Sequence, residues 1–79
     1  MEDRLYVYTI YDHPLDYPTT YVIKRWYVDA NSNGKPTRDP DYGFENPDLE
    51  ICRKEMMKLG LVCMLPSKND DPVILETWI

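Results

Sequence analysis

The chain has 79 residues and a formal net charge of −5 at pH 7. A single domain of this length buries only about 60% of the surface that the unfolded chain exposes, so its core is thin. The hydrophobic fraction of 43% excludes a disordered chain, and the acidic balance argues against nucleic acid and anionic membranes, which need clustered Lys and Arg.

The first predicted element is a strand over residues 5–11, where β-branched and aromatic side chains follow one another. It ends before Pro14, because proline donates no hydrogen bond to a strand ladder. Pro14 and Pro18 are expected to make residues 12–19 a stiff loop. A second strand is predicted over residues 20–28, and the two strands should pair as an antiparallel hairpin.

The second strand has two faces because its side chains alternate. One face carries Val22, Lys24, Trp26 and Val28, and the other carries Tyr21, Ile23, Arg25 and Tyr27. We expect the face with Trp26 to pack into the core, together with Val7 or its neighbours in the first strand.

Residues 29–45 are predicted to be irregular because Asn33-Gly34, Pro36, Pro40 and Gly43 interrupt them. A helix should follow, with Asn46 as its N-cap, Pro47 at its first position and Gly60 at its end. One apolar stripe of this helix comprises Leu49, Cys52, Met56 and Leu59.

Two further strands are predicted, over residues 61–65 and 73–79, with a polar turn at 67–72 between them. Leu61, Cys63, Leu65 and Leu75 should join the helix stripe in the core. The expected fold class is α+β: a small, mainly antiparallel sheet with one helix packed on a face, in the order β-β-α-β-β over a single domain, 1–79.

Two cysteines, Cys52 and Cys63, do not make a disulfide framework. The first residues lack the basic and apolar regions of a signal peptide, and no apolar run approaches about 20 residues. The sequence therefore predicts a cytosolic protein with reduced thiols.

Both ends of the chain resemble a group of known proteins. The segments concerned are YTIYDHP at residues 8–14, DYP at 16–18, YVIKRW at 21–26 and DDPVILETWI at 70–79. They resemble small, uncharacterised accessory proteins of tailed phages and prophages. The resemblance implies a phage accessory protein located in the cytoplasm of a bacterial host, and it supplies no catalytic residues to carry over.

The segment from Asp29 to Gly34, with Asn31 and Asn33, matches the first six positions of an EF-hand calcium loop. The match then ends, because Pro40 stands at the twelfth position, which requires a bidentate glutamate. Asn-Gly beside Asp is also ordinary turn chemistry. A turn is the preferred interpretation and no metal is expected, although whether the loop binds a cation stays open.

His13 is the sole histidine, and as a general base it would need a nucleophile nearby. Cys52 and Cys63 lie in apolar segments, where a thiol usually behaves as a small hydrophobic group. Two cysteines and one histidine at these spacings do not form a closed zinc site either. The sequence therefore predicts a protein that is not an enzyme and holds no cofactor.

Two segments combine aromatic and acidic side chains and are candidates for partner binding. The first contains Asp39, Asp41, Tyr42, Phe44 and Glu45, and the second is the stiff loop with Asp12, His13 and Tyr17. Aromatic side chains carry much of the energy of protein interfaces, and charge sets the rate of approach. The alternative for the first segment is a solvated loop that leads into the helix.

Six tyrosines lie in the predicted hairpin or its loop: Tyr6, Tyr8, Tyr11, Tyr17, Tyr21 and Tyr27. With a helix on only one face of the sheet, about half of them must point outward. They either brace neighbouring strands or form a contact surface, and both interpretations stay open. The same strands hold Lys24 and Arg25, so a stacking platform for a nucleotide is conceivable, although basic residues are few.

These observations predict a non-enzymatic phage accessory protein that binds a bacterial host protein with a basic patch in a stoichiometric complex. It would act in host takeover or as an anti-defence inhibitor, for example in an anti-CRISPR-like role, without nucleic acid or membrane. The alternative is an oligomeric small-molecule binder that sequesters a nucleotide signal, because one core of 79 residues hardly encloses a ligand alone. The host target and the oligomeric state are left open.

Overall fold

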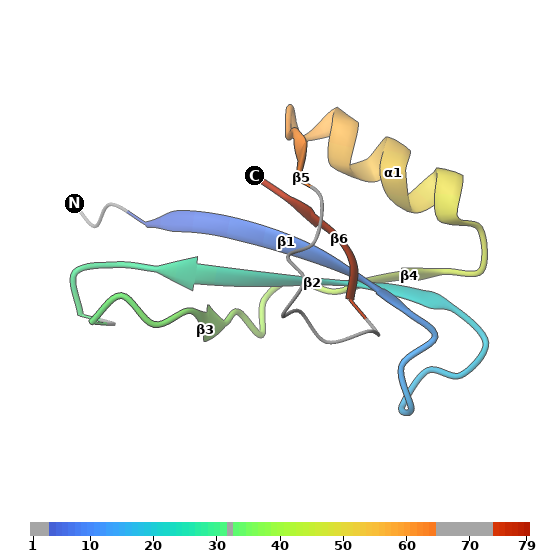
Figure 1. Cartoon of the computed structure of the whole chain (residues 1–79), viewed down its shortest axis with the longest axis horizontal. Helices are drawn as coiled ribbons and strands as arrows, with labels where there is room; N and C mark the ends of the chain where they lie inside the picture. The colour runs from blue at the N-terminus through green and yellow to red at the C-terminus, as the bar shows by residue number, and fades with distance from the viewer. Residues whose placement is uncertain (1–3, 32, 65–73) are drawn as a thin grey trace.

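The computed structural model describes residues 4–31, 33–64 and 74–79. In this part of the chain the elements follow in the order β1 (Leu5–Asp12), β2 (Tyr21–Val28), β3 (Thr37–Arg38), β4 (Phe44–Asn46), α1 (Leu49–Lys58), β5 (Cys63–Met64) and β6 (Ile74–Trp78). The strands form one sheet, and α1 lies over one of its faces (Figure 1). The predicted α+β class, with one helix on a mainly antiparallel sheet, is confirmed.

The sheet is centred on the long antiparallel pair of β1 and β2, as predicted. These strands pair over their full length, from Leu5 opposite Val28 to Asp12 opposite Tyr21. The sheet order is β3-β2-β1-β6-β5, and β4 also pairs with β2. The short strands β3 and β4 lie in the stretch that was predicted to be irregular, because two and three residues between Pro and Gly leave no periodic pattern.

The helix packs on the face of β2 that carries Ile23, not on the face that carries Trp26. Ile23 and its partner Ile10 are fully buried, and both belong to the same core cluster as Cys52 and Met56 of α1. The prediction that placed Trp26 under the helix is therefore wrong. On the opposite face Trp26 is half-buried, and its indole Nε1 donates a hydrogen bond to Thr9 Oγ1 at 3.0 Å.

The predicted helix stripe is confirmed at its centre and fails at its end. Cys52 and Met56 are fully buried and Leu49 packs against the core, whereas Leu59 is 47% exposed. Leu59 is the C-cap, and Gly60 follows with φ +77, so the helix ends where the glycine predicted.

The N-cap of α1 is Asp48 and not Asn46. The Asp48 side chain accepts a hydrogen bond from the backbone N–H of Glu50, with an oxygen–nitrogen distance of 2.9 Å. Asn46 belongs to β4, where it lies opposite Tyr21, and its side chain accepts a hydrogen bond from the N–H of Asp48. Pairing with β2 keeps Asn46 extended, and the helix therefore begins at Leu49, after Pro47.

Glu76 and Trp78 are the buried residues of β6, whereas Leu75 is only half-buried. The register with β1 shifts between Ile10 and Tyr11, so Leu75 has no direct partner in that strand. Of the other predicted core residues, Leu61 packs against the core and Cys63 is exposed. Leu65 and the predicted turn at 67–72 lie outside the described residues.

Substitution of two adjacent methionines of α1 tests which face of the helix packs in the core. Met56 is fully buried and Met57 is 58% exposed. We expect Met56→Ala to lower the free energy of unfolding by about 2–4 kcal/mol, because it removes buried apolar volume. The control, Met57→Ala, should change it by no more than about 0.5 kcal/mol. Chemical denaturation measures both, and similar losses in the two variants would contradict this packing.

Candidate functional site

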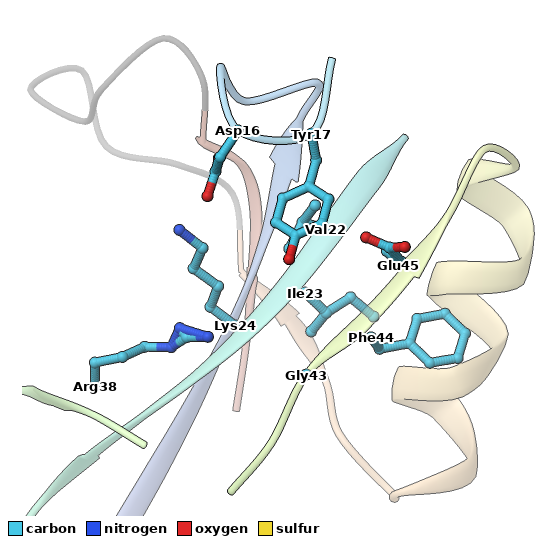
Figure 2. Close-up of a pocket in the computed structure, with 9 residues that line it drawn as sticks. All are labelled: Asp16, Tyr17, Val22, Ile23, Lys24, Arg38, Gly43, Phe44 and Glu45. Atoms are coloured by element: carbon cyan, nitrogen blue, oxygen red, sulfur yellow. The ribbon is translucent and has the colours of Figure 1, made fainter. Parts of the chain in front are cut away.

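The outer edge of β2 is covered in two places, with an opening between them. β3 pairs with β2 at Trp26 and Tyr27, and β4 pairs with it from Tyr21 to Ile23. Between β3 and β4 the chain leaves the sheet over residues 39–43. A cavity of about 490 Å³ lies beside this gap, with lining residues from β2, β3, β4 and the loop after β1 (Figure 2).

The strand pairings decide which side chains reach the cavity. Arg38 lies opposite Trp26 and Glu45 lies opposite Val22, so both point to the face that α1 does not cover. Lys24 is on the same face of β2, two residues from Val22. Phe44 lies opposite Ile23, and its ring points toward the helix and away from the opening (Figure 2).

The loop after β1 contains a tight turn that borders the cavity. The backbone N–H of Tyr17 donates to the carbonyl of Pro14 at 2.8 Å, and Pro14 itself is buried. Leu15, at the tip of the turn, is fully exposed, and the Tyr17 side chain is partly exposed at the rim of the cavity. The turn thus presents an isolated apolar side chain to solvent.

His13 holds the start of this turn. Its backbone has a positive φ of 50°, and its Nδ1 lies 2.5 Å from the carboxylate Oδ1 of Asp12. The imidazole also packs against the ring of Tyr21, with 4.7 Å between the ring centroids. Ring packing and the Asp12 contact hold His13 at the start of the turn.

The first predicted binding segment does not form one exposed surface. Asp39 is buried, and its carboxylate Oδ2 accepts hydrogen bonds from the Arg25 guanidinium at 2.6 and 2.7 Å. Tyr42 and Phe44 are partly buried and pack against the core. Asp41 stays exposed. Only part of the Tyr42 ring and of the Phe44 ring is therefore open to a partner.

The partly buried ring of Tyr42 contacts both an aromatic and a cationic side chain. Its ring makes an edge-on contact with Tyr8 at 5.2 Å, and the Arg25 guanidinium lies 5.3 Å from the Tyr42 ring centre. Burial raises the pKa of the Tyr42 hydroxyl to about 12. The sequence did not reveal this, because Tyr42 lies in a stretch rich in turn-forming and acidic residues.

The structure instead brings together members of both predicted segments. Tyr17 from the loop and Glu45 from β4 line the same cavity, whereas Asp12 and His13 lie at the base of the turn. Arg38 was missed as a site residue, and Lys24 was considered only together with Arg25, as a stacking platform for a nucleotide. Strand alternation placed Lys24 on the correct face, but Arg38 needed the register of β3, which the sequence did not show.

Three tyrosines of the hairpin make cation–π contacts with arginine or lysine side chains of the same chain. Arg25 lies over Tyr6 at 4.7 Å, and Lys24 lies over Tyr11 at 4.8 Å. A third stack joins Arg4 to Tyr27 at 4.1 Å. These contacts favour the bracing interpretation for these three tyrosines. Among the described residues, no such stack involves Tyr17.

The segment from Asp29 to Gly34, which resembles the start of an EF-hand loop, forms a turn in which the Asp29 carboxylate contacts other groups of the chain. Its Oδ1 accepts a hydrogen bond from the N–H of Asn31, and its Oδ2 lies 3.4 Å from Arg4 Nε. Asn33 and Gly34 both have positive φ, as in tight turns. Over the described residues, no three His, Cys, Asp or Glu side chains gather in a way that could hold a metal ion.

Comparison with models of protein families, with curated proteins and with solved structures gave no match for this chain. Within the residues described, no helix has the length and hydrophobicity needed to cross a membrane.

The two thiols provide a test of cysteine reactivity. Burial raises the pKa of the Cys52 thiol, and desolvation together with the Glu76 carboxylate raises the pKa of the Cys63 thiol. Less thiolate means slower alkylation. At neutral pH we expect Cys63 to react with iodoacetamide more slowly than glutathione, and Cys52 to react only after unfolding. Cys63→Ser isolates the second thiol for mass spectrometry. Alkylation of either thiol faster than glutathione would contradict this prediction.

The Asp39 carboxylate is expected to make the free energy of unfolding depend on pH in the acidic range. The backbone N–H of Asp41, and then Arg25, lower the pKa of its carboxylate. A lowered folded-state pKa adds stability above the unfolded-state value of about 4, and this stability is lost as the pH falls below it. We expect Asp39→Asn to lower stability at pH 7 and to flatten the acid decline. The control Asp41→Asn alters an exposed carboxylate and should keep the wild-type profile. Thermal melting at several pH values measures the difference, and equal profiles for Asp39→Asn and wild type would contradict it.

Proposed function

We propose that this protein acts by binding another protein in a stoichiometric complex, with the turn from Pro14 to Tyr17 at the centre of its contact surface. The observation that supports this proposal is the fully exposed Leu15 at the tip of the turn. Burial of a leucine side chain contributes about 1.5–3 kcal/mol. A pocket on a partner would provide that burial, which the fold itself does not.

The turn is ordered before any partner arrives. Pro14 is buried, the N–H of Tyr17 is bonded to the Pro14 carbonyl, and His13 is held by Asp12 and by the Tyr21 ring. A loop that is already fixed loses little conformational entropy on binding. Leu15 would therefore act as a preformed apolar anchor that a pocket of the partner buries.

Charge around the turn suits a basic partner. Asp12 and Asp16 lie on either side of Leu15 in the sequence and are exposed, and Glu45 is exposed at the neighbouring rim of the cavity. The chain as a whole carries −5. Complementary charge speeds encounter and fixes orientation. With the phage resemblance of the sequence, we propose a bacterial host protein as the partner and inhibition of host or defence machinery as the consequence.

Replacement of Leu15 tests this proposal. We expect Leu15→Ser to abolish capture of a stoichiometric partner from bacterial lysate and to leave the melting temperature unchanged, because the side chain makes no core contact. Leu5→Ser is the matched control, since Leu5 is 62% exposed and lies at the start of β1, away from the turn. It should capture the same partner as the wild type.

Affinity for the captured partner, once purified, gives the quantitative measurement. Equal dissociation constants for the wild type and Leu15→Ser would contradict the role of the turn. The proposal would also fail if the wild type retained no protein in stoichiometric amount.

A further inference from the structure

The cavity beside β2 carries charges of both signs. Lys24 and Arg38 supply two cations, and Asp16 and Glu45 supply two carboxylates (Figure 2). Among the described residues, none of these four side chains forms an ion pair with another. A ligand that carries both an anionic group and hydrogen-bond donors could pair with the two cations and with the two carboxylates.

The two cations favour an anionic group with several oxygens. The ring of Tyr11 holds the Lys24 ammonium on the open face of the sheet, 4.8 Å from its centre. Arg38 adds a planar guanidinium, which binds phosphate oxygens through two parallel hydrogen bonds. Two like charges at one opening repel each other, and a phosphate between them removes this repulsion.

The remaining lining groups favour a ring and hydroxyl or amino groups. The side chain of Tyr17 lies at the rim and offers a face on which a base can stack. Carboxylates such as those of Asp16 and Glu45 only accept hydrogen bonds when ionised, so they suit ribose hydroxyls or base amino groups. Val22 contributes an apolar part of the lining.

We infer that this cavity binds a nucleoside monophosphate, with its phosphate at Lys24 and Arg38 and its base on Tyr17. The cavity volume of about 490 Å³ lies within the range of roughly 300–1,000 Å³ that is usual for ligand sites. Inorganic phosphate would contact only Lys24 and Arg38, and an amino acid would not stack on the Tyr17 ring. A nucleic acid strand is disfavoured by the net charge of −5. This binding is additional to the proposed docking through Leu15.

Titration calorimetry with AMP, GMP, CMP and UMP tests the inference, with adenosine, guanosine, cytidine, uridine and inorganic phosphate as separate arms. We expect saturable binding of one nucleotide per chain for at least one of the four. It should be about tenfold tighter than binding of its nucleoside or of phosphate, because charge-assisted and stacking contacts act together. Absence of saturable binding at millimolar concentrations, or phosphate binding as tightly as the nucleotide, would overturn the inference.

Variants locate the binding in the cavity. Lys24→Gln and Arg38→Gln should each weaken nucleotide binding about tenfold. Lys54→Gln removes the same charge from an exposed position on α1 and should leave the affinity unchanged. An equal loss in Lys54→Gln would show attraction by charge alone and would overturn the site.

Stacking is tested at Tyr17. Tyr17→Phe keeps the ring and should keep the affinity, whereas Tyr17→Leu should reduce it about tenfold. Equal affinities of these two variants would exclude the stacked base. Leu15→Ser should bind nucleotide as the wild type does, so failure of the docking proposal and failure of this inference give different results.

Discussion

The Glu76 carboxylate is buried between the sheet and α1, and the arrangement of the two layers depends on its partners. Arg53 of the helix donates to Glu76 Oε2 through Nε at 2.9 Å and Nη2 at 2.5 Å, and the indole of Trp78 donates to Oε1. A buried charge without partners is costly, so this contact favours the helix orientation in which Arg53 faces Glu76. In this orientation Cys52 and Met56 of α1 pack with Ile23 in the core cluster.

A second guanidinium–carboxylate pair shapes the edge of the sheet. Arg25 holds Asp39 where the chain leaves β3, and the N–H of Asp39 bonds to the Arg25 carbonyl at 2.9 Å. Asp39 in turn accepts the N–H of Asp41, so the chain bends outward before it returns as β4. Tyr42 enters the core within this bend. The cavity beside β2 lies where this bend separates β3 from β4.

The proposed functions use what these constraints leave free. Asp39 and Glu76 form ion pairs with arginines. Asp16 and Glu45 instead line the cavity, and Leu15 lies outside the core. Asp16 and Tyr17 belong both to the turn that would dock on a partner and to the cavity that would take a nucleotide. A domain with so thin a core has few rigid places for contacts, and a turn held by proline and hydrogen bonds is one of them.

Local chemistry in the sequence determined the β1–β2 hairpin, the loop after β1, the end of α1 at Gly60 and the α+β class. Each depends on neighbours along the chain, such as alternating side chains or a glycine that accepts positive φ. The tertiary structure alone decided which face of β2 packs under the helix, because both faces carry large aromatic and cationic side chains. It also decided that Tyr42 is buried and that Arg38 and Glu45 share a cavity. The ion pairs of Glu76 and Asp39 accompany these outcomes, and their arginine partners lie 23 and 14 residues away in the chain, beyond the reach of any periodic pattern.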